Sequence, residues 1–189
     1  MYSPKYLVDT NVILARANYR NYDEIVFPIY WKNFDKLVNN GIIISTTSVS
    51  KEIKDLVKRQ EVDDQILTWA NNNSHMFKFP MDEKYTDETK NIKNKLPGWY
   101  RRNRKKADWD LVVFAKAYNL ILVTQETPNF TKKKQKEYKI PTACKKLGAY
   151  CRCGIEVTSN IDPTQTSFQC INFVELARRE KLNRIEFDM

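Results

Sequence analysis

The six residues YLVDTN at positions 6–11 decide the predicted fold of this chain. The first three are apolar and predict a short strand, and Asp9, Thr10 and Asn11 then offer side-chain oxygens suited to opening a helix. Asp9 therefore stands at the carboxyl end of a strand. Parallel α/β sheets bind their ligands outside this end of the strands, so Asp9 is the first candidate for a functional site.

The same succession of apolar strand and amphipathic helix continues along the chain. Residues 42–44 and 120–123 are uninterrupted apolar runs, which are typical of parallel strands covered on both faces. Apolar side chains at helical spacing predict helices over residues 28–40, 49–57 and 62–70. We therefore expect an α/β fold of three layers, α/β/α, around a central and mainly parallel sheet.

The segment 74–106 is polar and basic, and its pattern is less regular. Within it, residues 82–95 predict an exposed helix, and Pro97-Gly98 indicates a turn. Beyond this segment, Leu111 and the apolar residues around it share one side of a further helix.

The organisation of the sequence favours one domain over residues 1–189, because no repeat, low-complexity tract or linker divides it. We expect the core over about residues 6–150. Residues 151–189 are expected as a C-terminal extension, with an extra strand or loop and a terminal helix around residues 171–181.

The composition is that of a basic globular protein. The chain has 189 residues, 42% of them hydrophobic, and its 32 Lys and Arg against 23 Asp and Glu give a net charge of +9. Such a length and apolar fraction suit one domain that folds unaided. The excess of cations points to a polyanionic partner, because Lys and Arg displace the counterions condensed on nucleic-acid phosphates.

Scarce residue types argue against several classes of enzyme. His75 is the only histidine, which disfavours histidine triads, His-pair ribonucleases and multi-histidine metal sites. The four glycines are too far apart for a nucleotide phosphate loop. Any catalysis by this chain must therefore rely on carboxylates.

The hydropathy pattern predicts a cytoplasmic protein. No apolar run approaches the roughly 20 residues needed to span a bilayer. The start of the chain lacks the charged and apolar regions of a signal peptide. We therefore expect no membrane partner.

The cysteines lie in the last quarter of the chain, and in a reducing compartment they should be thiols. Cys151 and Cys153 are separated by one residue, which places their sulfurs close together. A structural zinc site, however, normally has two pairs with the spacing C-x2-4-C. We favour buried or idle thiols and leave zinc open as the alternative. The four are Cys144, Cys151, Cys153 and Cys170.

Acidic residues stand at strand ends or at the starts of the following helices. They are Asp9, Glu52, Asp108 or Asp110, and Glu126. Such positions can meet across a parallel sheet, and clustered carboxylates repel one another unless a cation neutralises them. A hard cation, Mg²⁺ or Mn²⁺, fits this group and can activate water for attack on a phosphodiester.

These acids and their neighbours resemble the motifs of the PIN domain superfamily, over roughly residues 6–150. The matching stretches are Tyr6–Asn11, Ser48–Glu52, Ala107-Asp108 and Leu122–Glu126. The resemblance implies a PIN-like α/β/α nuclease fold and a divalent-metal site. It makes Asp9, Glu52, Asp108 and Glu126 the catalytic and metal-binding acids, supported by Thr10, Asn11 and Thr124.

Many PIN domains are the ribonuclease toxins of VapC-like toxin-antitoxin modules. The stretch Lys139–Cys144 is similar to a less studied PIN-like branch found beside helix-turn-helix or metallopeptidase-like antitoxin genes. The resemblance therefore implies RNA as substrate and an antitoxin protein as partner. It leaves a homodimer open.

The third acid is open between Asp108 and Asp110. Two positions along a helix differ by a rotation of about 200°, so only one of these side chains should face a small metal site. The motif favours Asp108. Asp110 is then expected as a supporting residue. It would either interact with the helix dipole as an acid in the first turn or contact the Arg101–Lys106 loop.

Two basic runs flank the predicted site and are candidates for nucleic-acid binding. They are Arg101, Arg102, Arg104, Lys105 and Lys106, and Lys132, Lys133 and Lys134. Trp99, Tyr100 or Phe130 could stack on unpaired bases beside them. The alternative is that both runs are solvated loops.

We therefore predict an endoribonuclease in which metal-activated water hydrolyses RNA phosphodiesters and leaves a 5′-phosphate and a 3′-hydroxyl. The alternative is a PIN-like module that binds RNA or the ribosome without catalysis. A domain that binds a protein partner is a third interpretation.

Overall fold

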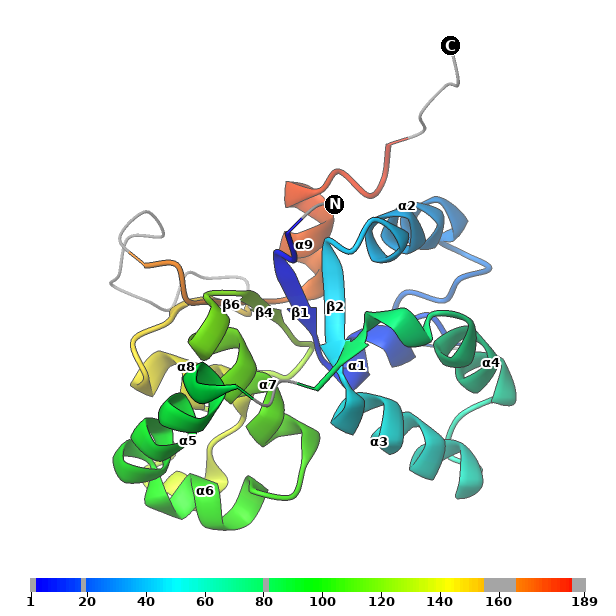
Figure 1. Ribbon diagram of the computed structural model, residues 1–189. Helices are drawn as coiled ribbons and strands as arrows, with labels where there is room; N and C mark the ends of the chain where they lie inside the picture. The colour runs from blue at the N-terminus through cyan, green and yellow to red at the C-terminus, as the bar shows by residue number, and fades with distance from the viewer. Residues whose placement is uncertain (1–2, 18–19, 80–81, 155–165, 185–189) are drawn as a thin grey trace.

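Strand β1 (Tyr6–Val8) is buried along its whole length. Consecutive side chains of a strand point to opposite faces, so both faces of β1 must be covered. The computed structural model describes residues 3–17, 20–79, 82–154 and 166–184. In these ranges helices lie on both faces of a central sheet, which confirms the predicted three-layer α/β/α fold (Figure 1).

The described sheet is parallel throughout. Its strands follow the order β3-β2-β1-β4-β6-β5, and every adjacent pair is parallel. The other strands are β2 (Ile43–Thr46), β3 (Phe77–Lys78), β4 (Ile121–Val123), β5 (Tyr150–Arg152) and β6 (Gln169–Ile171). All carboxyl ends therefore lie along one edge, with those of β1 and β4 side by side at its centre.

The helices form the two outer layers and extend past the sheet. Helices α7 and α8 pack on one face, whereas α2 and α9 lie on the other, where Trp31 stacks on Phe173 (Figure 1). The helices are α1 (Thr10–Leu14), α2 (Pro28–Asn39), α3 (Thr47–Lys58), α4 (Asp64–Asn72), α5 (Glu83–Lys95), α6 (Pro97–Asn103), α7 (Ala107–Tyr118), α8 (Ile140–Lys146) and α9 (Phe173–Arg179), with short 3-10 helices η1 (Ser74–Met76) and η2 (Gln135–Glu137). No helix in the described ranges is long and apolar enough to cross a membrane.

Helix ends follow the sequence signals. Asp9 is the N-cap of α1, and its side chain accepts a hydrogen bond from the Thr10 amide. Thr46 is the N-cap of α3, and its side chain accepts a hydrogen bond from the Val49 amide. Gly41 follows α2 with a φ of +71°, a conformation that glycine adopts without strain.

The expected turn at Pro97-Gly98 is wrong. Pro97 is instead the first residue of α6. A proline suits the first turn of a helix, because its fixed φ is helical and its missing N–H would have no partner there. The neighbouring prediction is confirmed, because residues 83–95 form the exposed helix α5.

The central sheet continues beyond residue 150, where we expected the core to end. Residues 169–171 form β6, which lies between β4 and β5. The segment 151–189, expected as an extension, therefore supplies an inner strand of the core. Residues 155–165 lie outside the described residues. The expected terminal helix is present as α9, over residues 173–179.

The cysteines are buried, as we expected. Cys151 of β5 lies opposite Cys170 of β6 in the strand register. The sulfur of Cys153 is 3.4 Å from the sulfur of Cys170. Burial raises the pKa of Cys144 and of Cys170, so both side chains are neutral thiols.

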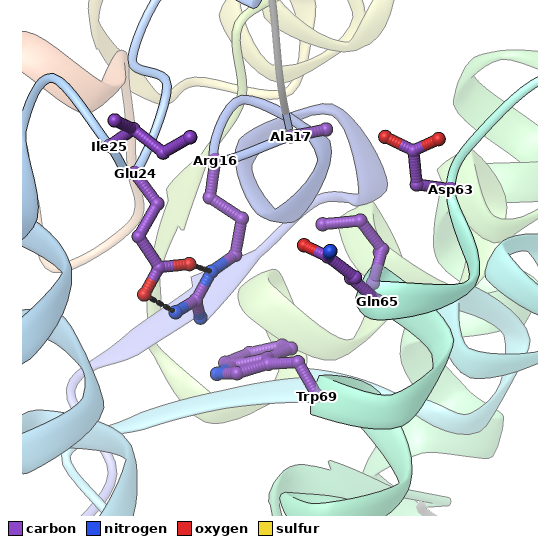
Figure 2. A pocket seen from close by; sticks show the side chains of 8 residues that line it. Arg16, Ala17, Glu24, Ile25, Asp63, Gln65 and Trp69 are labelled. Atoms are coloured by element: carbon purple, nitrogen blue, oxygen red, sulfur yellow. Dashed lines mark hydrogen bonds and ion pairs between the residues drawn. The ribbon is translucent and has the colours of Figure 1, made fainter.

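Arg16 anchors the segment between α1 and α2. Its side chain is 3% exposed, and its guanidinium donates two hydrogen bonds to Glu24, at 2.9 and 2.8 Å, and two to Asp35, at 3.1 and 3.2 Å. It also lies over the rings of Trp31 and Trp69, 4.9 and 4.5 Å from their centroids. Figure 2 shows Arg16 with Glu24 and Trp69 at the wall of a pocket. One cation thus joins α1, α2 and α4.

We expect Arg16→Ala to lower the free energy of unfolding by about 2 to 3 kcal/mol, because it leaves two carboxylates and two rings without their cation. Urea unfolding measures the change. Arg59→Ala is the control, since Arg59 and its partner Glu61 are 61% and 52% exposed. This control should change stability by less than about 0.5 kcal/mol. Equal effects of the two substitutions would contradict the anchoring role.

Candidate active site at the strand ends

Asp9 is the centre of the site and is held in place by three hydrogen bonds. Its Oδ1 accepts from the Thr10 amide at 2.7 Å. Its Oδ2 accepts from Asn11 Nδ2 at 2.6 Å and from Thr124 Oγ1 at 2.7 Å. The residue is only 5% exposed. The ends of β1 and β4 therefore fix the direction of this carboxylate.

Two further acids are held by hydrogen bonds, Glu52 from Thr10 in α1 and Glu126 from Ile140 in α8. Glu52 of α3 is exposed, and its Oε2 accepts from Thr10 Oγ1 at 2.6 Å. Glu126 is half-buried after β4, and its Oε2 accepts from the Ile140 amide at 2.7 Å. Thr124 joins Glu126 to Asp9, because its Oγ1 also accepts from the Glu126 amide at 3.1 Å.

The acids act on one another electrostatically. Burial raises the pKa of Asp9 to about 8, and the negative charges of Asp108, Glu126 and Glu52 add to this rise. The hydrogen bond from Thr124 opposes it. The other three acids predicted from the sequence therefore lie within electrostatic reach of Asp9, although the four come from separate stretches of the chain.

Nearby cations oppose the rise in pKa of the two half-buried acids, Asp108 and Glu126. Burial raises the pKa of Asp108, and Lys106 and Arg102 counteract this rise. Burial also raises the pKa of Glu126; Asp108 adds to the rise, while Lys139 and Arg102 oppose it. Arg102 thus acts on both acids. Lys139 was not among the predicted site residues, although it begins the stretch Lys139–Cys144 that resembles a PIN-like branch.

Asp110 belongs to a different set of contacts. Its Oδ1 accepts from Tyr85 Oη at 2.8 Å, and its Oδ2 accepts a hydrogen bond from Ser48 Oγ. Burial and the charge of Asp110 raise the pKa of Tyr85, so the phenol keeps its proton and donates it. The structure therefore places Asp108 within electrostatic reach of Asp9 and Glu126, whereas Asp110 is hydrogen-bonded to Tyr85 and Ser48.

The donor set suits a hydrated hard cation. The side chains around Asp9 offer carboxylate, hydroxyl and amide oxygens, which are the ligands that Mg²⁺ and Mn²⁺ prefer. No three His, Cys, Asp or Glu side chains among the described residues form a ready-made metal site. Mg²⁺ does not require one, since it keeps several waters and usually takes one or two carboxylates together with substrate phosphates.

Comparison with protein families gives one match. A family model with the description "Domain of unknown function (DUF4411)" matches residues 6–162. The chain belongs to this family. The match begins at β1 and includes Asp9, Glu52, Asp108 and Glu126, so the proposed site lies wholly within the DUF4411 domain. No curated protein and no solved structure matches the chain.

The basic runs of this DUF4411 protein lie side by side. The Gly98 amide donates to Gln135 Oε1 at 2.9 Å, and Arg102 donates to the Lys136 carbonyl, which joins α6 to η2. A hollow of about 530 Å³ lies between these elements. We call its cationic rim, formed by Arg101, Arg102, Lys134 and Lys136, the basic surface. Arg102 links it to the acids.

The other predicted basic residues surround this surface. Lys132 is exposed and lies 3.8 Å from Glu137. The remaining ones are exposed at the C-terminal end of α6, in the α6–α7 connection or before η2: Arg104, Lys105, Lys106 and Lys133.

The expectation that Trp99 stacks on bases is wrong. Its side chain is completely buried, packs at 5.6 Å from Trp109 and donates to the Tyr138 carbonyl. Tyr100 is partly buried and packs edge to face on Trp109. Phe130 is half-exposed, with Lys145 over its ring. The apolar surface of Trp99 is too large to remain in solvent beside an available core.

Proposed function

We propose that this chain is a divalent-metal-dependent endoribonuclease. The observation that supports this most is the buried Asp9 carboxylate at the end of β1, which lies within electrostatic reach of three more acids. Such a cluster of like charges destabilises a protein unless it serves to hold a cation. The resemblance to PIN nucleases supports the same assignment.

A Mg²⁺ or Mn²⁺ ion bound by Asp9, Glu52, Asp108 and Glu126, directly or through water, would supply an activated water for attack on a phosphodiester. The side chains around the acids have their own tasks. Thr124 and Asn11 fix the direction of the Asp9 carboxylate. Arg102 and Lys139 lie near the acids and attract the negative phosphate, which reduces repulsion between RNA and the site.

We further propose that the protein is the toxin of a toxin-antitoxin module. The resemblance to toxin ribonucleases supports this role, with RNA as substrate and an antitoxin protein as partner. Induced expression of the wild-type chain should then arrest growth, whereas the Asp9→Asn variant at equal abundance should not. Normal growth with the wild type would contradict the toxin role.

The direct test is incubation of the purified protein with total RNA in Mg²⁺, Mn²⁺ or EDTA, followed by mapping of the RNA ends. We expect internal cuts with 5′-phosphate and 3′-hydroxyl ends in either metal and none in EDTA. An Asp9→Asn sample purified in parallel controls for contaminating nucleases. Cleavage that persists in EDTA would refute the metal-dependent reaction.

A second candidate is a module that binds RNA or the ribosome without cutting it. The basic surface favours this candidate, because its exposed cations would bind a phosphate backbone whether or not the acids cut it. The same experiment separates the two, because a binding module retains RNA in all three buffers without producing new ends.

The basic surface gives a prediction for binding. Arg101→Ala combined with Lys134→Ala should weaken RNA binding and reduce the log–log slope of affinity against salt by about 0.7 for each phosphate that is no longer neutralised. Fluorescence anisotropy in EDTA measures this without cleavage. Lys32→Ala combined with Arg59→Ala is the control, because both residues are exposed and lie outside this surface. Equal slopes for the two variants would mean that the basic surface is only solvated.

A further inference from the structure

A hollow of about 260 Å³ lies beside the acids and has no part in the chemistry proposed for them. We call it the Arg20 hollow; it is lined by Asn11, Leu14, Ala15, Arg20, Asn21 and Gln125. Asn11 belongs to both the hollow and the site. Its Nδ2 donates to Asp9 Oδ2 at 2.6 Å, and its Oδ1 accepts from the Gln125 amide at 2.7 Å. The wall of the hollow is thus one hydrogen bond away from the central carboxylate.

The lining combines an apolar part with unused polar groups. Ala15 is buried and Leu14 is half-buried, so they offer apolar surface. Arg20 and Asn21 are exposed, and Gln125 is half-exposed. Within the part of the chain that the structure describes, none of these three polar side chains takes part in a hydrogen bond or an ion pair. They are therefore available to a ligand.

This combination matches the chemistry of a nucleotide. A guanidinium without a carboxylate partner binds phosphate through charge-assisted hydrogen bonds. Side-chain amides offer a donor and an acceptor together, which is what base edges require. An apolar surface beside them can contact the face of a base. A purely apolar ligand would leave Arg20 unused, and a free anion would leave Leu14 and the amides unused.

The hollow and the basic surface adjoin different members of the acid cluster. The basic surface adjoins them through Arg102, next to Asp108 and Glu126. The hollow adjoins them through Asn11, next to Asp9. A single strand of RNA whose phosphodiester lies at the carboxylates can therefore reach both.

We propose that the Arg20 hollow holds one unpaired nucleotide of the RNA strand next to the phosphodiester that is cleaved. This rests on the proposed ribonuclease function and adds a subsite to it. Arg20 binds a backbone phosphate of that nucleotide, and Asn21 and Gln125 contact the edge of its base.

The first test is binding of a fluorescently labelled, single-stranded hexaribonucleotide to the full chain in EDTA. Arg20→Ala should weaken binding about tenfold and lower the salt slope by about 0.7, since it removes one charge-assisted hydrogen bond to phosphate. The control Arg59→Ala removes the same charge elsewhere and should stay within about twofold of the wild type. Circular dichroism checks that both variants are folded.

A second pair of variants removes no charge. Asn21→Ala should weaken binding about three- to tenfold, because its side chain no longer hydrogen-bonds the base, whereas Asn39→Ala, at the end of α2, should not. A hexamer with one 4-thiouridine, irradiated in the complex, should cross-link to residues lining the hollow, as mapped by mass spectrometry.

The outcomes separate this subsite from the function on which it rests. If the wild type neither binds nor cuts RNA, the ribonuclease proposal fails and the subsite with it. If the wild type cuts RNA but Arg20→Ala equals Arg59→Ala, the subsite alone is refuted. Cross-links confined to the basic surface would also refute it and would leave the hollow to a protein partner.

Discussion

Asp9→Asn is expected to reduce metal-dependent RNA cleavage by at least about a hundredfold. The amide keeps the size of the side chain; its oxygen can still accept from the Thr10 amide, and its NH2 group can donate to the Thr124 hydroxyl, which also acts as an acceptor, so the fold should survive. It removes the negative charge that a hard cation requires. Cleavage of a labelled RNA with Mn²⁺ or Mg²⁺ measures the loss, and RNA binding in EDTA should remain.

The control for this variant is Asp55→Asn. Asp55 is an exposed acid on α3, the helix that also contains Glu52. This substitution makes the same change of charge outside the site and should leave cleavage within about twofold, because it takes no part in the hydrogen bonds that orient Asp9. Cleavage by Asp9→Asn at the wild-type rate would remove Asp9 from the proposed chemistry.

The same variant has a predicted effect on stability. The pKa of Asp9 rises from 3.8 to about 8 on folding. Between these values the folded state binds a proton that the unfolded state has lost, so the stability of the wild type falls as pH rises through this window. Asn does not titrate. In EDTA, Asp9→Asn should therefore gain stability over the wild type as pH rises from about 5 to about 8.

Thermal unfolding in EDTA at the two ends of this pH window tests the sign. Divalent cation should raise the melting temperature of the wild type at the alkaline end, since a ligand that binds only the folded state stabilises it. It should do little for Asp9→Asn. A stability difference between wild type and variant that does not change with pH would contradict the electrostatic account of Asp9.

The sequence predicts the centre of the fold because each signal there is local. The run at residues 6–8 is apolar at every position, and Asp9 follows it as a helix cap. Parallel pairing then brings Thr124 to Asp9 without further information, since β4 neighbours β1. Asp9 and Glu126 could therefore be grouped from strand ends, whereas Glu52 and Asp108 were grouped with them from helix starts and the resemblance to PIN domains.

Other features depend on contacts between distant residues and gave no local signal. Strand β6 has only three residues, and its place beside β4 could not be inferred from Gln169–Ile171 alone. Trp99 lies in a polar, basic stretch, yet it is buried by Trp109. The Arg20 hollow combines residues of α1, the segment after it and the end of β4, which only the folded chain brings together.

The choice between Asp108 and Asp110 gives the second large prediction. Both lie in the first turn of α7, and a separation of two residues turns their side chains about 200° apart. Asp108 acts electrostatically on Asp9 and Glu126. Asp110 instead accepts hydrogen bonds from Ser48 and Tyr85. We therefore expect Asp108 to serve catalysis and Asp110 to serve stability.

Asp108→Asn should reduce metal-dependent cleavage at least about a hundredfold and leave the free energy of unfolding unchanged or higher, because burial disfavours its charged form. Asp110→Asn should retain cleavage within about threefold but lose about 1 to 2 kcal/mol, since charge-assisted hydrogen bonds become neutral ones. Tyr85→Phe removes one of those bonds and should resemble Asp110→Asn in urea unfolding. Loss of cleavage only in a folded Asp110→Asn variant would mean that the electrostatic interaction of Asp108 with Asp9 has no part in the reaction, and that the metal is held from the opposite side of α7.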